Sequence, residues 1–412
     1  MSVTAFFKCK KTIARLHKGP LDSYIGVYAD RLVAEGHCCQ SGARCIRVAA
    51  DYSAWLASKR HGVADVNEDS IKQYEQFRKK YRRPFLSDHS ALIRLLMVLR
   101  ETNATAPCKT MVLEPLAQVV LDFEQYQRQD RGLCETSVIR HRPPLKKFLR
   151  QCCSEGVSSF STLTGKDVTQ FLVQHAHDQS PSSAKNMCWT LRAFSRYLLY
   201  QGHTTQDLAS AVPSIRAWRL TTLPENLSAQ QIETVLSSCD KGSALGLRNY
   251  AVLMLLSRLG LRANEIALLR LDDINWHSGS LNIRGKGRTL VSLPLLSEVG
   301  AALSDYLLKA RPKTKSRSLF VRAIAPHSRL ASSAVISYIA TSALIRAGLE
   351  LQHKGAHIFR HSLASNLLRA GASLPEIGQV LRHKSHDSTR IYAKVDIDGL
   401  RALAMPWPGA AQ

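Results

Sequence analysis

The sequence predicts a mainly helical protein of the α+β class, with two all-helical modules ahead of a larger domain that contains a small β-hairpin. Three observations predict this class. Apolar residues recur at three- and four-residue steps over most of the chain. One short stretch instead alternates at two-residue steps around a glycine-bounded turn. The length of 412 residues and the hydrophobic fraction of 45% suit two or three domains with ordinary cores.

The charge of the chain is strongly basic. Its 56 Lys+Arg against 32 Asp+Glu give a formal net charge of +24. Because the basic residues are spread along the chain, we expect a polyanionic partner such as DNA, with a merely soluble basic protein as the alternative. A membrane partner is not expected, since no amphipathic basic helix is set apart and the apolar run Ala251–Leu256 is far too short to span a bilayer.

The cysteines give no sign of a disulfide framework or of a zinc site. All ten lie before residue 240, without CxxC…CxxC spacing. His37, Cys38 and Cys45 are conceivable metal ligands, but we expect buried free thiols there. Met1–Phe7 is too short an apolar run for a secretory signal. We therefore expect a cytoplasmic protein in a reducing compartment.

The first 108 residues contain a basic lead and a helical module. Residues 1–20 carry Lys8, Lys10, Lys11 and Arg15, and we expect either a loose arm along DNA or a frayed terminus. Residues 21–108 form an additional N-terminal helical module. We expect its helices from Leu21 to Gly36, from about Ser41 to Leu56, from Asp69 to about Arg78, and around Leu92–Leu99.

A similar pattern recurs over residues 113–212. Gly36 and Gly132 each begin a short segment of similar sequence. Arg44 and Arg140 lie at the same distance after these glycines, so one constant offset relates the two copies. An aromatic-bearing helix and then a capped helix follow in both copies, and the second copy adds a long helix. We therefore predict two all-helical modules in tandem, and the basic charge of the chain makes DNA the expected partner of both.

Residues 213–227 have two prolines and no periodicity, so we predict a linker before a mixed domain over residues 228–400 and a tail over residues 401–412. The strands of the hairpin are expected at Ser280–Arg284 and Thr289–Pro294. Helices are expected at Ala229–Ser237, Leu247–Leu259, Arg262–Leu269, Glu298–Ala310 and Ala334–Ala347, from His357, from Ser373 to near Arg382, and around Tyr392.

Six polar residues of this domain have side chains suited to cleaving a phosphodiester: Arg262, Lys286, His357, Arg360, His383 and Tyr392. Cleavage without a metal needs cations on the non-bridging oxygens, a nucleophile, and an acid for the leaving oxygen. Arginine binds phosphate oxygens bidentately, and lysine or histidine supplies a proton. Tyrosine attacks when neighbouring cations favour its phenolate.

Each of these residues alone has an ordinary structural explanation, such as a solvated helix face or a packing aromatic. Two other motifs are excluded. Gly285–Thr289 lacks the upstream glycine of a phosphate-binding loop. Asp396–Gly399 lacks the further ligands of a calcium loop. The six residues as a set remain the stronger signal.

The set resembles the tyrosine recombinase (phage integrase) family, of the mobile-element or plasmid type, over about Ser228 to Leu400. The matching boxes are Leu259–Ile266 with Arg262 and Glu265, Arg284–Gly287 with Lys286 and then Leu293–Leu295, His357–His361 with Arg360, Leu381–His383, and Thr389–Tyr392. The gaps of 24 (286−262), 23 (383−360) and 9 (392−383) suit the catalytic domain of that family. Arg382 stands where the family commonly has glycine. The module at 113–200 resembles its core-binding domain, and residues 21–108 lie outside its usual two domains.

The resemblance implies a role for each matching residue. Tyr392 attacks the scissile phosphate and leaves a 3′-phosphotyrosyl bond and a free 5′-hydroxyl. The other roles are phosphate clamps for Arg262 and Arg360, general acid for Lys286, a phosphate hydrogen bond for His383, assistance in proton transfer for His357, and support of the site for Glu265. The covalent link conserves bond energy, so no cofactor, neither ATP nor metal, is implied.

The implied partner is double-stranded DNA with specific recombination sites, bound by a homo-tetramer with or without related recombinases, in the bacterial nucleoid. We expect a site-specific recombinase that integrates, excises or transposes a mobile element. Two alternatives stay open. A non-catalytic DNA-binding accessory protein of the same fold has no need of the complete set of six residues. A topoisomerase-like or resolvase-like strand transferase keeps the chemistry, but tandem helical modules favour extended site recognition.

Overall fold

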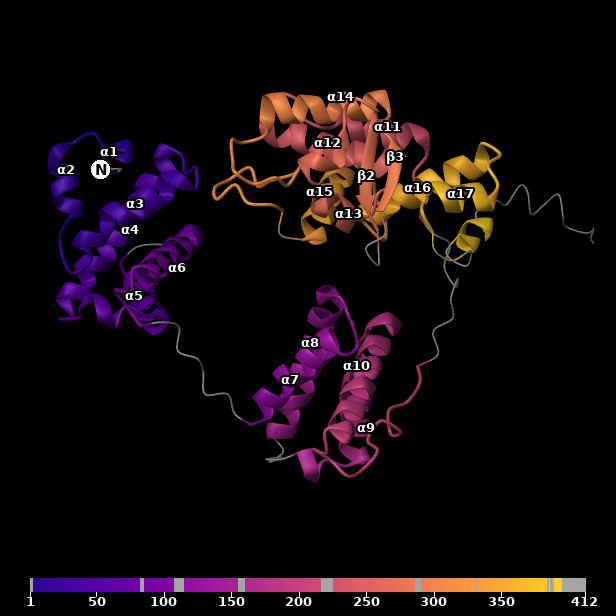
Figure 1. Ribbon diagram of the computed structural model, residues 1–412, viewed down its shortest axis with the longest axis horizontal. Helices are drawn as coiled ribbons and strands as arrows, with labels where there is room; N and C mark the ends of the chain where they lie inside the picture. The colour runs from indigo at the N-terminus through magenta and orange to yellow at the C-terminus, as the bar shows by residue number, and fades with distance from the viewer. Residues whose placement is uncertain are drawn as a thin grey trace, which may run out of the picture. The chain divides into compact units, whose positions relative to one another are not determined.

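The structure is a computed structural model of the chain (Figure 1). It describes residues 3–81, 85–106, 115–154, 160–215, 225–285, 290–330, 332–383, 385 and 389–394. Contacts divide the chain into two compact units, residues 108–221 and residues 1–107 with 222–412. The predicted fold class is confirmed, because the chain is mainly helical with one small antiparallel sheet.

The first 107 residues form a helical module with its own apolar core. Its helices are α1 (Val3–Phe6), α2 (Lys10–Leu16), α3 (Asp22–Ala34), α4 (Cys39–Ser58), η1 (Val63–Asp65), α5 (Glu68–Lys79) and α6 (Leu86–Glu101). Asn67 begins α5 by accepting the backbone amides of Asp69 and Ser70 at 3.0 and 2.9 Å. Cys45 is buried as predicted, whereas Cys38 is exposed at the start of α4.

The basic lead differs from the loose arm expected for residues 1–20. Its apolar residues Val3, Phe6, Phe7 and Leu16 are buried in the same core as α3 and α4. Ser53 on α4 fastens the turn after α2, because its hydroxyl donates to the Lys18 carbonyl at 2.9 Å and accepts the Leu21 amide at 3.1 Å. The apolar residues between the lysines therefore pack this segment onto the module.

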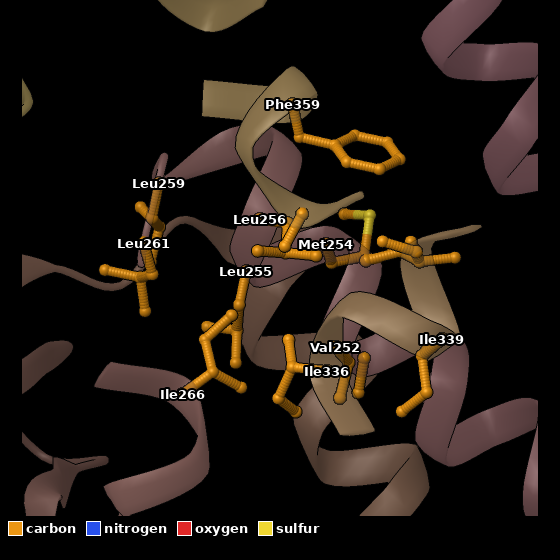
Figure 2. Packing of buried hydrophobic residues seen from close by; sticks show 14 of the residues in the cluster. Val252, Met254, Leu255, Leu256, Leu259, Leu261, Ile266, Ile336, Ile339 and Phe359 are labelled. Atoms are coloured by element: carbon orange, nitrogen blue, oxygen red, sulfur yellow. The ribbon is translucent and has the colours of Figure 1, made fainter. Parts of the chain in front are cut away.

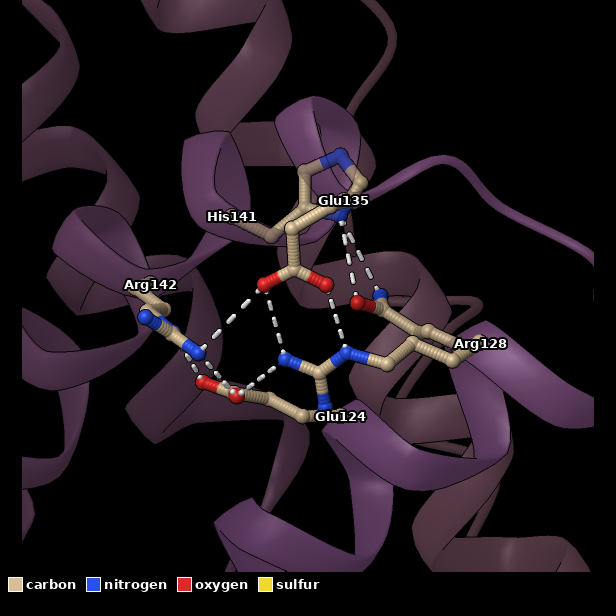
Figure 3. Close-up of polar contacts among 6 residues, drawn as sticks. Glu124, Arg128, Glu135, His141 and Arg142 are labelled. Atoms are coloured by element: carbon tan, nitrogen blue, oxygen red, sulfur yellow. Dashed lines mark hydrogen bonds and ion pairs between the residues drawn. The ribbon is translucent and has the colours of Figure 1, made fainter. Parts of the chain in front are cut away.

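Residues 108–221 contain the second helical module. Its helices are α7 (Pro115–Gln129), α8 (Glu135–Ser154), η2 (Phe160–Thr162), α9 (Gly165–Ala176) and α10 (Pro181–Tyr200). Figure 3 shows an ion-pair network that joins α7 to α8. Arg142 donates to both oxygens of Glu124 at 2.6 and 2.7 Å, and Arg128 donates to Glu135 at 2.7 Å. This network links the side chains of α7 to those of α8 across the turn between them.

The two helical modules contain helices of similar length in the same order. Helices α4 and α8 have 20 residues each and begin 96 positions apart (135−39). Gly36 and Gly132 precede them at the same offset (132−36), with φ values of +80° and +58°. Gly36 ends α3 in the left-handed region, which favours glycine, and Gly132 adopts the same region three residues after α7. Helices α3, α4 and α5 thus correspond in order to α7, α8 and α9. The sequence pattern predicted α10 as an addition of the second copy, whereas α6 follows α5 in the first module as α10 follows α9 in the second.

The last part of the chain combines helices with a three-stranded antiparallel sheet in the order β1-β2-β3. Its elements are α11 (Ala229–Ser237), α12 (Ala244–Arg258), α13 (Ala263–Leu268), η3 (Leu271–Asp273), β1 (Ile274–Asn275), β2 (Ser280–Arg284), β3 (Leu290–Pro294), α14 (Ser297–Asp305), the π-helical turn η4 (Tyr306–Ala310), α15 (Ser333–Arg346), α16 (Ala356–Arg369), α17 (Leu374–Val380) and η6 (Arg390–Lys394). The predicted hairpin is confirmed in β2 and β3, which pair Leu281 with Leu293. The two-residue strand β1 is too short for a periodic signal.

Helix α12 is the centre of this core and contacts α11, α13, α14, α15 and α16. Its run Ala251–Leu256 is buried throughout. Figure 2 shows Leu255 and Leu256 of this helix among Ile266 and Phe359, which come from α13 and α16. The core therefore holds the ends of α12, α13 and α16 against one another. Within the described ranges, no helix has the length and apolar character to cross a membrane.

Candidate active site

Arg262 begins α13, directly after the turn that ends α12. Glu265 accepts the Arg262 backbone amide at 2.9 Å and the Arg262 Nη1 at 2.8 Å. The Arg262 side chain is 38% exposed, whereas that of Glu265 is 6% exposed. A buried carboxylate thus holds the guanidinium in place and leaves part of it open to a ligand.

Arg360 lies on α16 and is only 6% exposed. Its Nη1 donates to the Gly260 carbonyl at 2.5 Å, and its Nη2 donates to the Leu381 carbonyl. Burial, and then the charges of Arg262 and Arg382, lower the pKa of Arg360 to about 10. The guanidinium remains protonated at neutral pH.

Gly260 gives Arg360 the room for this contact. Its φ is +54°, and a Cβ atom there would lie 2.9 Å from the Leu363 side chain and 3.0 Å from that of Leu381. A residue with a side chain is therefore disfavoured both by backbone conformation and by space. Glycine at this position therefore allows the chain after α12 to turn so that the Gly260 carbonyl oxygen reaches the Arg360 guanidinium.

Arg382 joins the same cluster from the turn after α17. Its Nη2 donates to Glu265 Oε2 at 3.1 Å, and both side chains are buried. Burial alone would raise the pKa of Glu265, but hydrogen bonds from Arg262 and the charge of Arg382 lower it below its ordinary value. Glu265 therefore stays ionised and connects the first arginine box to the later histidine box.

Tyr392 lies on η6 and is 1% exposed, packed with Ala364, Ile377 and Leu381. Its hydroxyl lies 2.9 Å from His361 Nδ1. Burial raises the pKa of Tyr392 above its ordinary value, although the charges of Arg360 and Arg262 oppose that shift. The phenol is therefore protonated at neutral pH and hydrogen-bonded within the cluster.

Three histidines surround the tyrosine and the arginines. Burial, and then neighbouring positive charges, lower the pKa of His357 and bring the pKa values of His361 and His383 to about 4. All three imidazoles are therefore neutral at pH 7. His383 Nδ1 lies 2.8 Å from Thr389 Oγ1, and its ring stacks on that of Tyr392 with centroids 6.4 Å apart. His357 and His361 also line a pocket of about 510 Å³.

Comparisons with known proteins identify the family to which the chain belongs. Residues 225–398 match the phage integrase family. A putative integrase/recombinase (y4rA) of Sinorhizobium fredii is 39% identical over 410 residues, which cover 99% of each chain. The chain belongs to the phage integrase family of tyrosine recombinases.

Tyrosine recombinases of lower sequence identity also match most of the length of this chain. A tyrosine recombinase XerD of Mycobacterium tuberculosis is 30% identical over 320 residues, which cover 72% of this chain and 98% of that protein. The crystal structure of the XerH site-specific recombinase bound to a palindromic difH substrate, a post-cleavage complex, superposes with a TM-score of 0.55 at 22% identity. That match covers 75% of this chain and 87% of the XerH chain, and it shows a common fold.

The structure brings most of the predicted site residues of this tyrosine recombinase into one cluster. These residues are Arg262, Glu265, His357, Arg360, His383 and Tyr392. Lys286 belongs to the β2–β3 connection and lies outside the described residues, so its predicted role remains a prediction. On the β2 side of that connection, Arg284 binds Asp273 with two hydrogen bonds of 2.8 and 2.6 Å.

Two residues of the cluster were absent from the predicted site. His361 follows Arg360 in the same sequence box, and its contact with Tyr392 depends on where η6 packs. Arg382 precedes His383, at a position where this sequence differs from the glycine that is common in the family. Both stand next to a predicted site residue, so the boxes marked the right segments but not every side chain in them.

Residues 225–227 connect the catalytic fold to the chain that precedes it, and they are fastened to α16. The Leu227 amide donates to Ser362 Oγ at 2.7 Å. The Glu225 carboxylate accepts the backbone amides of residues 352–353, both at 2.9 Å. These two hydrogen bonds lower the pKa of Glu225. The incoming chain is therefore bonded to the helix that carries Arg360 and to the loop before it.

Proposed function

We propose that this tyrosine recombinase cleaves and rejoins double-stranded DNA at specific sites through a 3′-phosphotyrosyl intermediate. The observation that supports this most is the position of Tyr392, whose hydroxyl is bonded to a neutral histidine and lies within the electrostatic influence of two arginines. A phenol in that setting has both a proton acceptor and positive charge beside it.

The charges of the cluster favour an anionic ligand. Arg262, Arg360 and Arg382 carry three positive charges against the single negative charge of Glu265, a net of two (3−1). Arg360 and Glu265 are buried, where a fixed charge interacts more strongly than in water, whereas the Arg262 side chain is 38% exposed. A phosphodiester placed between Arg262 and Arg360 would neutralise one of the two charges and receive bidentate hydrogen bonds.

The proposed reaction is a transfer of the phosphoryl group from the DNA 5′-oxygen to the tyrosine. The Tyr392 oxygen forms a bond to phosphorus while the bond from phosphorus to the 5′-oxygen breaks. The phenolic proton passes to His361 Nδ1, and Lys286 protonates the leaving 5′-oxygen. His383 donates to the phosphate, and His357 assists proton transfer. Rejoining is the reverse reaction with a 5′-hydroxyl as nucleophile.

Tyr392 must be uncovered before it attacks. At 1% exposure its ring has almost no contact with solvent, and its hydroxyl is held by His361. DNA binding must therefore move η6, or the residues that bury Tyr392, so that the Tyr392 hydroxyl reaches phosphorus while the arginines stay in place. We propose that cleavage is coupled to this movement.

The proposed partner is double-stranded DNA that carries recombination sites, and the proposed assembly is a homo-tetramer on two sites, with or without related recombinases. The XerH structures are complexes with a DNA substrate, and the y4rA relative is named an integrase/recombinase. We propose integration, excision or transposition of a mobile element as the outcome, through a Holliday junction.

The test is covalent trapping on a nicked duplex. Footprinting on DNA that flanks the gene first identifies the site, and a duplex nicked next to the cleavage position then prevents rejoining. We expect the wild-type protein to form a covalent protein–DNA band that resists denaturant. The variant Tyr392→Phe should form none, and the control Tyr338→Phe, at a 72% exposed tyrosine on α15, should trap normally.

Three results would each favour another interpretation. Covalent trapping by Tyr392→Phe would show that another residue is the nucleophile. A footprint without any trapping by the wild-type protein would favour a non-catalytic accessory protein of the same fold. Relaxation of supercoiled plasmid without a site would favour a topoisomerase-like activity.

A further inference from the structure

The first helical module has a basic groove that the proposed chemistry does not use. This groove has a volume of about 630 Å³ and lies along α4, between the end of α2 and the end of α5. Its charged lining residues are five cations and one anion: Arg15, Lys18, Arg44, Arg47, Arg78 and Asp51. The groove therefore has a strong excess of positive charge on a module outside the catalytic fold.

Two of these cations are fixed by the protein. The Asp88 carboxylate, 7% exposed, accepts a hydrogen bond from Arg78 at 3.0 Å and lies 3.5 Å from Arg44. The Arg44 guanidinium also lies over the Phe85 ring, 3.5 Å from its centroid. Both arginines are thus held in position before any ligand binds, which lowers the entropic cost of binding one.

The other three cations are exposed at the groove. Within the described ranges, Arg15, Lys18 and Arg47 form no ion pair with a carboxylate. Lys18 is held next to α4 by the hydrogen bond from the Ser53 hydroxyl to its carbonyl oxygen. These three side chains therefore lie on the surface of the first helical module, and their positive charges are available to an external anion.

The second module has a groove at the same positions of the corresponding helix. That groove, about 320 Å³, is lined along α8 by Arg140, Pro143, Pro144 and Lys147. Subtracting the repeat offset of 96 gives Arg44, Arg47, Val48 and Asp51, which line the groove of the first module along α4. The same helix face is hollowed in both modules, and each hollow contains an arginine at the same repeat position.

We propose that the groove of the first module binds the phosphodiester backbone of duplex DNA, so that the chain contacts DNA with both helical modules as well as with the catalytic fold. A groove with cations on both walls and one carboxylate suits a polyanion. Its charges act on the backbone, so they add affinity and length of contact rather than base recognition. The inference rests on the proposed function only in taking DNA as the partner.

The test measures the salt dependence of DNA binding by the full chain in a Tyr392→Phe background. Fluorescence anisotropy follows binding to a random-sequence duplex of about 30 base pairs over about 50 to 200 mM KCl. The groove variant is Arg15→Ala/Lys18→Ala/Arg47→Ala. The matched control, Lys59→Ala/Lys79→Ala/Lys80→Ala, removes three exposed charges of the same module that do not line the groove.

The groove variant should lower the slope of log affinity against log salt by about two to three, because each phosphate contact contributes about 0.9. Its affinity at about 0.15 M salt should fall on the order of 100-fold, while the control variant changes both quantities far less. Equal losses in the two variants would mean that only the overall charge matters, and no loss in the groove variant would overturn the proposal.

A variant that adds positive charge to the groove distinguishes a loss of charge from misfolding of the protein. Asp51→Lys places a lysine where the second module has Lys147 and should strengthen salt-dependent binding, which a damaged protein cannot do. An unchanged or weaker affinity of Asp51→Lys would contradict the proposal. Because the background lacks the nucleophile, these results do not depend on covalent trapping. The proposed chemistry and the groove therefore succeed or fail separately.

Discussion

The Nδ1 atom of His361 lies 2.9 Å from the hydroxyl oxygen of Tyr392. The two residues come from different elements, α16 and η6, and are 31 positions apart. His361 is neutral at pH 7, because burial and then the charges of His357 and Arg360 bring its pKa to about 4. A neutral imidazole at this distance either holds the phenol in place or accepts its proton, and the two roles make different predictions.

Substitutions of His361 separate these roles. His361→Asn keeps a hydrogen-bonding atom near the position of Nδ1 but accepts no proton, whereas His361→Phe removes both properties. If His361 accepts the proton, both variants should slow covalent trapping by about 100-fold or more. Single-turnover trapping on the nicked duplex measures this. A wild-type rate in His361→Asn with a slow rate in His361→Phe would assign His361 to positioning alone.

Substitutions of Arg262 and Arg360 should differ in their effect on stability, although both residues are proposed to act in cleavage. Arg360→Ala leaves the buried Gly260 and Leu381 carbonyls without their donor and should lower the free energy of unfolding by about 2 to 4 kcal/mol. Arg262 is 38% exposed, and Arg382 still pairs with the buried Glu265 when the Arg262 side chain is removed, so Arg262→Ala should cost less, about 1 to 2 kcal/mol.

Urea unfolding compares the stabilities of these two variants, and trapping on the nicked duplex compares their activities. Both variants should lose trapping while DNA affinity falls only modestly, because each arginine is one phosphate contact among many. Equal stability of the two variants would contradict a structural role for Arg360. Loss of binding in step with cleavage would show that they act mainly in affinity.

Arg382 has φ +55°, a backbone conformation that costs a residue with a side chain about 1 kcal/mol or more. Arg382→Ala removes the bond to Glu265 and keeps that backbone cost, whereas Arg382→Gly removes both. We therefore expect Arg382→Gly to be more stable than Arg382→Ala by about 1 kcal/mol. Thermal unfolding of the two variants measures the difference. Equal melting temperatures would mean that the backbone at this position relaxes without cost.

Acid should destabilise the catalytic fold through its histidines. His361 and His383 have pKa values of about 4 in the folded chain against an ordinary value of 6.5, so the unfolded chain binds their protons more readily. Their contribution to stability is complete above about pH 6.5 and falls as the pH is lowered towards 4. The variant His361→Gln/His383→Gln should lose less melting temperature between about pH 7.5 and pH 5 than the wild-type protein.

Calorimetry at the two pH values checks this, with His277→Gln as the control because that histidine is exposed on the turn between β1 and β2. The control should lose as much melting temperature on acidification as the wild-type protein. An equal loss in the double variant would mean that other groups control the acid sensitivity of the fold.

The sequence predicted the helices well wherever a periodic apolar face and a capping residue coincide. Ser228 and Ser373 each accept the amide of the third helical residue, as their capping boxes predict. Strand β1 escaped prediction because two residues carry no period. The basic lead was interpreted from its lysines, whereas its structure depends on Phe6 and Leu16 packing into a core formed by later helices.

The site was predictable as a set of residue types but not as a set of contacts. The boxes identify Arg360 and Tyr392, yet no local pattern shows that His361 is the residue that meets the phenol. That contact depends on how η6 packs against α16, which is a tertiary property. The left-handed backbone of Arg382 is likewise invisible in a sequence where glycine is the usual residue for that conformation.

The hydrogen bond from the Leu227 amide to Ser362 has a mechanical consequence. Ser362 lies two residues beyond Arg360 on α16, so tension in the incoming chain acts on the same helix that presents the Arg360 guanidinium. Glu225 restrains the loop before that helix in the same way. We therefore expect a pull on residues 225–227 to be transmitted to the position of Arg360, the residue proposed to hold the phosphate.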